Sequence, residues 1–125
     1  MAYKYFTFDE FDSPDSKGSG KHMSHEFLCL LDEAREISGI PFKINSGYRT
    51  KEYQKDLTRR GYKTSKTTSP HEKGLAADIS VTDSSSRWIV INSLLLVGFT
   101  RIGVADTFIH VDLDTERSQE VVWTY

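Results

Sequence analysis

The chain has 125 residues and a formal net charge of -2, with acidic and basic side chains mixed along its length. We expect residues 1–125 to form a single domain, because this length suffices to bury a core. The lack of a basic field argues against nucleic acid as a partner. No apolar run approaches the roughly 18–20 residues of a membrane span and no secretory signal is visible, so we expect a protein that is cytoplasmic at synthesis and does not insert into a membrane.

Patterns of apolar residues predict the secondary structure in chain order. In the first helix Ser24 can act as the N-cap and Gly39 as the terminating residue, while Cys29 falls in the apolar pattern and is predicted to be a small core residue. The predicted elements are a helix over Met23–Ser38, a strand over Phe42–Ser46, a helix over Lys51–Arg60, a strand over Gly74–Val81, a helix over Ser86–Val97, strands over Thr100–Val104 and Thr107–Leu113, and a last strand over Val121–Tyr125.

This order of helices and strands predicts an α+β fold. We expect a small antiparallel sheet with helices packed on one side. A functional site would then lie in a cleft over the sheet.

Two polar residues occupy strands that are otherwise apolar. Asp78 lies between Ala77 and Ile79, where an aspartate is costly unless it is paired or bound to a metal. His110 occupies a similar place in the strand over residues 107–113. If the two strands are neighbours, Asp78 and His110 can meet on the face opposite the core.

His71 can complete a metal site with these two residues. It precedes Asp78 with six residues between them, and His110 follows on a distant apolar strand. Two neutral imidazoles and one carboxylate are suitable ligands for zinc, and three protein ligands leave the fourth tetrahedral position open, as in catalytic sites. The small residues Gly74 and Ala76 would let backbone and substrate approach the metal closely.

Three separated motifs carry a resemblance to a known family. Residues 46–50 read Ser-Gly-Tyr-Arg-Thr, and residues 108–112 read Phe-Ile-His-Val-Asp. Residues 69–78 have the pattern Ser-x-His-x-x-Gly-x-Ala-x-Asp, with fixed positions at Ser69, His71, Gly74, Ala76 and Asp78. Over roughly residues 5–114 the chain resembles the zinc D-alanyl-D-alanine carboxypeptidases and the related phage L-alanyl-D-glutamate endolysins, a group that also holds lysostaphin-type enzymes and the hedgehog amino-terminal domain.

The resemblance implies a small α+β zinc peptidase that acts on peptidoglycan stem peptides. It implies that His71, Asp78 and His110 bind Zn²⁺. Arg49 would contact either the developing oxyanion or a substrate carboxylate. Ser69 either forms a hydrogen bond near the metal and the substrate or only begins the turn before Pro70.

The chain departs from the family pattern at the general base. Many relatives carry an acidic residue three positions before the last zinc histidine, and here that position is Thr107. The available acids are Asp112, on the strand face of His110, and Asp106, in the turn before the strand. We favour Asp112 over Asp106 as the catalytic carboxylate, although Asp112 could instead orient His110.

Taken together, these features predict a monomeric zinc peptidase that hydrolyses D-amino-acid-containing peptide bonds of peptidoglycan stem peptides. One alternative is an L-alanyl-D-glutamate endolysin that acts on the cell wall as a phage lysis or virion protein. Another is a cell-wall binding module that kept zinc and lost turnover, which Thr107 would permit.

Overall fold

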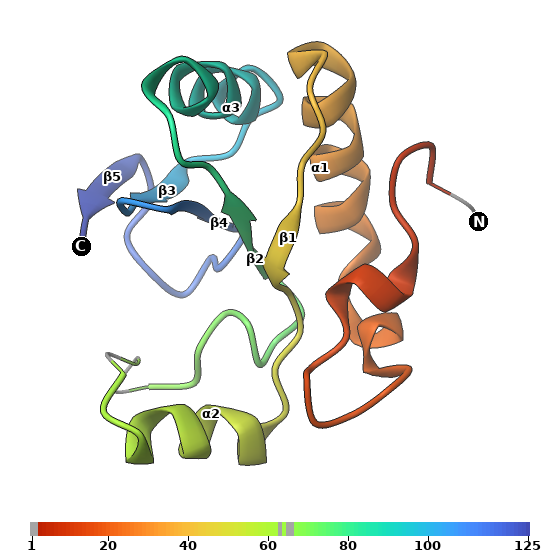
Figure 1. Cartoon of the computed structure of the whole chain (residues 1–125), viewed down its shortest axis with the longest axis vertical. Helices are drawn as coiled ribbons and strands as arrows, with labels where there is room; N and C mark the ends of the chain where they lie inside the picture. Colours follow the sequence, from red (N-terminus) through yellow and green to blue (C-terminus); the bar gives the residue numbers. More distant parts are fainter. Residues whose placement is uncertain (1–2, 63, 65–66) are drawn as a thin grey trace.

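The computed structural model describes residues 3–62, 64 and 67–125, which form a five-stranded sheet with helices around it (Figure 1). Every predicted helix and strand is present, with ends shifted by a few residues. The elements are η1 (Phe8–Phe11), η2 (Ser19–His22), α1 (His25–Ser38), β1 (Ile44–Ser46), α2 (Lys51–Arg59), β2 (Ala76–Ser80), α3 (Ser84–Leu96), β3 (Arg101–Val104), β4 (Phe108–Asp112) and β5 (Val121–Thr124), where η denotes a 3-10 helix.

The sheet has the strand order β1-β2-β4-β3-β5 and is mixed. Neighbouring strands from β1 to β3 pair antiparallel, whereas β5 pairs parallel with β3. The predicted α+β class is confirmed, but the last strand differs from the antiparallel arrangement we expected. The reason is the connection after β4: residues 113–120 carry the chain to the beginning of β3, where the N–H of Val121 donates to the carbonyl of Thr100 at 3.0 Å.

Helices α1 and α3 cover one face of the sheet (Figure 1). Ser24 caps α1 by accepting the N–H of Phe27 at 3.2 Å, and Gly39 ends it with φ of 72°, as the sequence predicts. The core between these helices and the sheet contains large, fully buried side chains: Phe27, Leu28, Leu31, Leu94, Ile79, Ile102, Ile109 and Val111. The N-terminal segment adds Phe6 and Phe11 to this core.

Helix α2 lies apart from α1 and α3 (Figure 1). Its buried residue is Gln54, which faces a cleft on the other side of the sheet. Expecting all helices on one side was therefore right for α1 and α3 only. None of the helices in the described ranges is long and apolar enough to cross a membrane.

Cys29 does not belong to the core. Its side chain is exposed on α1, with Sγ 3.3 Å from Nε2 of His25. Our prediction of a small core residue was wrong because the apolar stripe of α1 is narrower than the sequence pattern suggests. The buried stripe passes through Phe27, Leu28 and Leu31.

We predict that the central strand pair carries much of the stability of the fold. Ile109→Ala should lower the free energy of unfolding by about 2–5 kcal/mol, because the side chain is fully buried in β4. Urea unfolding in the presence of a chelator measures this without a contribution from bound metal. The control is Val122→Ala in β5, where the side chain is 60% exposed and the change should stay within about 0.5 kcal/mol. Equal losses for both variants would contradict this placement of the core.

Candidate metal centre

The register of the sheet brings Asp78 and His110 together. Asp78 of β2 stands directly opposite His110 of β4, and the row continues through Gly103 of β3 to Trp123 of β5. Because side chains alternate along a strand, these residues share the face opposite the core-facing Ala77 and Ile109. The predicted meeting of Asp78 and His110 is therefore confirmed.

His71 reaches the same point from a turn before β2. Its ring is buried, and Nδ1 donates to the carbonyl oxygen of Gly47 at 2.8 Å. Gly47 packs directly against Phe11, since a Cβ at this position would lie 2.8 Å from Cα of Phe11. A carbonyl oxygen can only accept, so the proton lies on Nδ1 and the lone pair of Nε2 faces Asp78.

Ser69 fixes the turn that holds His71. Its Oγ accepts the backbone N–H of His71 at 3.2 Å, and its own N–H donates to Oε1 of Glu72 at 3.3 Å. Ser69 is buried and also lines the cleft. Both alternatives from the sequence are thus compatible with its position.

His110 is oriented from behind by Asp112. Its Nε2 donates to Oδ2 of Asp112 at 2.7 Å, so Nδ1 points toward Oδ1 of Asp78 at 2.9 Å. Although burial acts to lower it, the pKa of His110 is raised above its usual range by the hydrogen bonds with Asp112 and Asp78. In contrast, burial lowers the pKa of His71.

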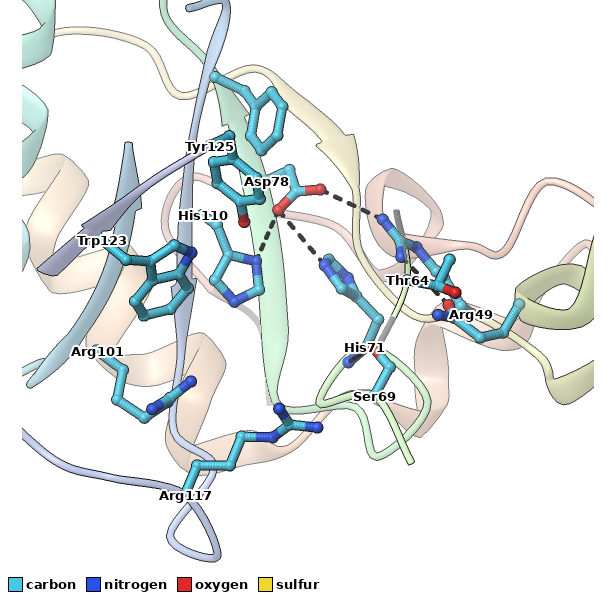
Figure 2. Close-up of a pocket in the computed structure, with 12 residues that line it drawn as sticks. Arg49, Thr64, Ser69, His71, Asp78, Arg101, His110, Arg117, Trp123 and Tyr125 are labelled. Carbon is cyan, nitrogen blue, oxygen red and sulfur yellow. Dashed lines mark hydrogen bonds and ion pairs between the residues drawn. The ribbon is translucent and has the colours of Figure 1, made fainter. Parts of the chain in front are cut away.

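The carboxylate of Asp78 is the centre of the cluster. Oδ1 lies 2.9 Å from Nδ1 of His110 and 3.4 Å from Nε2 of His71, while Oδ2 lies 3.3 Å from Nη2 of Arg49 (Figure 2). Burial opposes ionisation of this carboxyl, but the two histidines outweigh it and hold its pKa well below the usual range.

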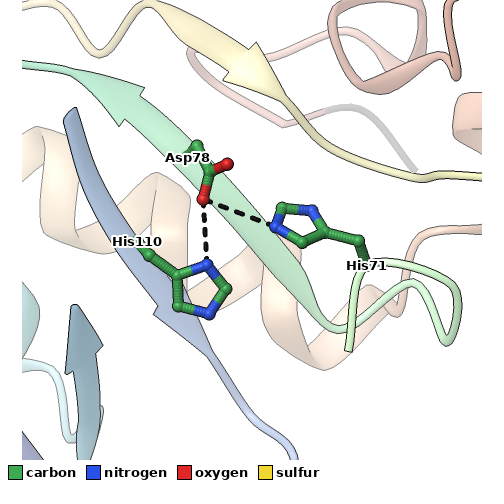
Figure 3. A group of neighbouring side chains, drawn as sticks. All are labelled: His71, Asp78 and His110. Carbon is green, nitrogen blue, oxygen red and sulfur yellow. Dashed lines mark hydrogen bonds and ion pairs between the residues drawn. The ribbon is translucent and has the colours of Figure 1, made fainter. Parts of the chain in front are cut away.

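These donor atoms suit a zinc ion. One ligand atom each from His71, Asp78 and His110 lies within 4.8 Å of the others, and all three residues are buried (Figure 3). Each histidine gives its other N–H to an oxygen acceptor, as metal-bound histidines do. Once Nδ1 of His110 has lost its proton, two imidazole lone pairs and a carboxylate oxygen face one another, and a cation between them would relieve the repulsion.

Arg49 lies beside this cluster, as the sequence suggested, but it has an additional contact. Its guanidinium donates to Oδ2 of Asp78 and is held by Oγ of Ser46 at 3.0 Å and Oε1 of Gln54 at 3.2 Å. Arg49 therefore borders the cleft and also anchors the oxygen of Asp78 that faces away from the histidines.

The cluster lies in a cleft of about 370 Å³ whose aromatic wall the sequence reasoning missed. The wall comes from Phe108 of β4 and from Trp123 and Tyr125, which Figure 2 labels. The ring centre of Trp123 lies 5.5 Å from that of His110, with the two rings tilted by 50°. The indole can lie there because Gly103 has no side chain, since a Cβ at that position would come within 2.7 Å of it. Alternation along the last strand, with aromatic residues at positions 123 and 125, was the signal available in the sequence.

The two acids considered as general base have different surroundings. Asp112 is 1% exposed, and its Oδ1 accepts from Nε of Arg101 at 2.7 Å and from the N–H of Asp114 at 3.0 Å. With Oδ2 on His110, this carboxylate lies behind the histidine, which suits orienting His110 better than accepting a proton in the cleft. Asp106 is exposed in the turn before β4 and does not line the cleft.

The comparisons with known proteins agree with this geometry. A family model described as Peptidase M15 matches residues 4–112, which is most of the chain and includes all three candidate ligands. No curated protein matches the chain.

We predict that zinc binds one-to-one and that His110→Ala abolishes this binding. Asp112→Asn should keep the site but weaken zinc affinity about 10–100-fold, because His110 loses the acceptor that orients it. Metal analysis and competition with a chromophoric chelator measure both effects. His25→Ala, on an exposed part of α1, is the control and should bind zinc normally. Full zinc content in His110→Ala would refute the ligand assignment.

We also predict that zinc affinity decreases as the pH falls. The ligand nitrogens must be deprotonated, and the raised pKa of His110 means that protons begin to compete above the ordinary histidine value of about 6.5. At pH values below the pKa of His110 in the metal-free protein, zinc must displace one proton from this residue. Zinc affinity should therefore fall about tenfold for each unit by which the pH decreases. Chelator competition between about pH 8 and pH 6 tests this. A flat profile over that range would contradict it.

Proposed function

The chain belongs to the peptidase M15 family of metallopeptidases, and we propose that it is a zinc-dependent peptidase acting on D-amino-acid-containing peptide bonds of peptidoglycan stem peptides. The observation that carries this proposal is the convergence of Nε2 of His71, Nδ1 of His110 and Oδ1 of Asp78 in a cleft. Both histidines are already oriented for a metal by Gly47 and Asp112.

A zinc ion held by these three residues would polarise the scissile carbonyl and lower the pKa of a water molecule toward about 7. The residues around the metal position would have separate roles. Asp112, held in turn by Arg101, keeps the imidazole of His110 turned toward the ligand position. Arg49 keeps Asp78 in place and offers a positive charge to an oxyanion or a substrate carboxylate.

Tyr125 lines the cleft and also carries a titratable group. Its ring packs 5.3 Å from that of Phe108, and burial together with nearby Asp78 raises the pKa of its phenol. The phenol therefore stays protonated at neutral pH and can donate a hydrogen bond, but it does not replace a carboxylate base.

The alternative of a zinc-bearing wall-binding module has one observation in its favour. Among the described residues that line the cleft, Asp78 is the sole carboxylate, and we assign it to the metal. Thr107, at the family position of the general base, is exposed and outside the cleft. Turnover would then depend on the metal and on Arg49. An L-alanyl-D-glutamate endolysin of a phage remains the second enzymatic candidate.

Digestion of purified peptidoglycan tests the function. We expect the zinc-loaded protein to release fragments whose masses identify the broken bond, and we expect chelation or His110→Ala to stop the release. Zinc binding without any fragment would reject the peptidase and favour the binding module. Cleavage between L-alanine and D-glutamate would favour the endolysin.

We predict that Arg49→Ala lowers kcat/KM by about 2–4 kcal/mol in transition-state stabilisation, as expected for loss of a cation near the oxyanion. Zinc affinity should fall as well, because Oδ2 of Asp78 loses its partner. The control is Arg59→Ala at the end of α2, whose side chain is 74% exposed and does not line the cleft. Near-normal turnover of cell-wall fragments by Arg49→Ala would contradict this prediction and would show that Arg49 has only a structural role.

A further inference from the structure

The phenol of Tyr125 reaches the candidate metal centre from the opposite side to Arg49. Tyr125 directly follows β5, and its side chain lines the cleft. Figure 2 shows its oxygen directed toward Asp78 and His110, whereas Arg49 approaches Asp78 from the other side. The phenol therefore faces the space in which the proposed reaction would occur.

Other aromatic residues hold the ring of Tyr125 in this position. Its ring centre lies 5.3 Å from that of Phe108, at an interplanar angle of 53°. Burial raises the pKa of the phenol, and a hydrogen bond from Trp123 acts against that rise. Trp123 is itself packed against His110 at 5.5 Å and against the guanidinium of Arg101 at 5.0 Å. A side chain with this support loses little conformational entropy when it binds a ligand.

The proton of the phenol is available to a ligand. An indole N–H can only donate, so the hydrogen bond with Trp123 uses the phenol oxygen as the acceptor and leaves the O–H itself unused. Among the residues that the structure describes, none accepts a hydrogen bond from this O–H. Tyr125 is 64% exposed, so a substrate can reach the O–H from the solvent. By contrast, Arg49 already donates to three acceptors of the protein.

We infer that Tyr125 is a catalytic residue that donates a hydrogen bond to the oxyanion formed from the scissile carbonyl. This inference rests on the proposed function. A hydrogen bond to a charged oxygen is stronger than one to the neutral carbonyl of the bound substrate. The contact would therefore stabilise the transition state more than the substrate complex, and its effect would fall on turnover and not on substrate binding.

The phenol itself neither gains nor loses a proton in this step. When water adds to the scissile carbonyl, a C–O bond forms and the electron pair of the C=O π bond moves onto the carbonyl oxygen, which becomes the oxyanion. One proton of the water passes to the leaving nitrogen, the C–N bond breaks and the C=O bond re-forms. Tyr125 stabilises the charge that exists between these two events.

A stem pentapeptide tests the inference, because it contains both candidate bonds, L-alanyl-D-glutamate and D-alanyl-D-alanine. We expect Tyr125→Phe to lower kcat of the zinc-loaded protein about 10–100-fold on the bond that is cleaved, as for loss of a hydrogen bond to a charged group, with little change in KM. Tyr125→Leu also removes the ring that packs on Phe108 and should lose at least as much.

Binding gives a readout that does not require turnover. Phosphinate analogues of the pentapeptide, with a tetrahedral anionic group in place of either bond, mimic the intermediate. Calorimetry should show that Tyr125→Phe binds the tighter of these two analogues about 10–100-fold more weakly than the wild type does. The affinity for the matching alkene analogue, which has no oxygen at that position, should not change.

Tyr62→Phe is the matched control. It removes the same hydroxyl from a side chain of similar exposure, 60%, which is not among the described residues that line the cleft. This variant should keep the wild-type kcat and both affinities.

Three results would overturn the inference. The first is a Tyr125→Phe variant that keeps kcat and phosphinate affinity, even if Tyr125→Leu loses them, since the ring alone would then matter. The second is an equal loss of affinity for the phosphinate and the alkene analogue. The third is a fall in zinc content or in thermal stability of Tyr125→Phe that accounts for its lower kcat.

The same measurements separate this inference from the proposed function. If the pentapeptide is not cleaved but Tyr125→Phe selectively loses affinity for the phosphinate, the contact with the tetrahedral anion stands and the peptidase fails. If the pentapeptide is cleaved and Tyr125→Phe matches the wild type, the peptidase stands and the inference fails. No cleavage together with equal binding by both proteins rejects both.

Discussion

A buried negative charge on Asp78 is the constraint on which the site depends. Moving a carboxylate out of water costs several kcal/mol, and the loss is recovered only when charged or hydrogen-bonding partners surround it. Here the partners come from three separate segments: His110 from the neighbouring strand, His71 from the preceding turn and Arg49 from the segment just before α2. The fold must therefore bring these segments together before β2 can be buried without a large penalty. A metal ion would stabilise the carboxylate of Asp78 more strongly than these side chains do, and this would couple metal binding to the stability of the sheet.

The two buried aspartates that flank His110 have different tasks because they face opposite sides of its imidazole. Asp78 meets Nδ1 of His110, where the other ligands converge, whereas Asp112 meets Nε2 and is itself held by Arg101. A carboxylate with both oxygens engaged and no exposed surface is well placed to fix a ring and badly placed to remove a proton from a bound water. Asp112 is therefore poorly placed to act as the general base. Activation of a water molecule would instead depend on the metal, on Arg49 or on the substrate itself.

The features that were predicted correctly from the sequence are those that local rules determine. Alternation in β2 and β4 assigned Asp78 and His110 to one face, and capping residues fixed α1 within a few residues. The parallel pairing of β5 could not be predicted, because it depends on where the loop of residues 113–120 delivers the chain. For the same reason the aromatic wall and Arg117 went unnoticed, since their place in the cleft is set by tertiary packing and not by any motif. The contact between Arg49 and Asp78 joins residues 29 positions apart and has no local signal.

The segment after β4 links the metal ligands to the surface that would meet the substrate. Arg101 connects the two, since one of its nitrogens binds Asp112, behind His110, and another binds the carbonyl of Ser118 in that segment. The same segment supplies Arg117 and then Trp123, whose ring lies against both His110 and Arg101. A displacement of this segment would disturb the orientation of His110 as well as the cleft wall. The cleft wall formed by residues 113–125 and the orientation of His110 are therefore parts of one connected structure.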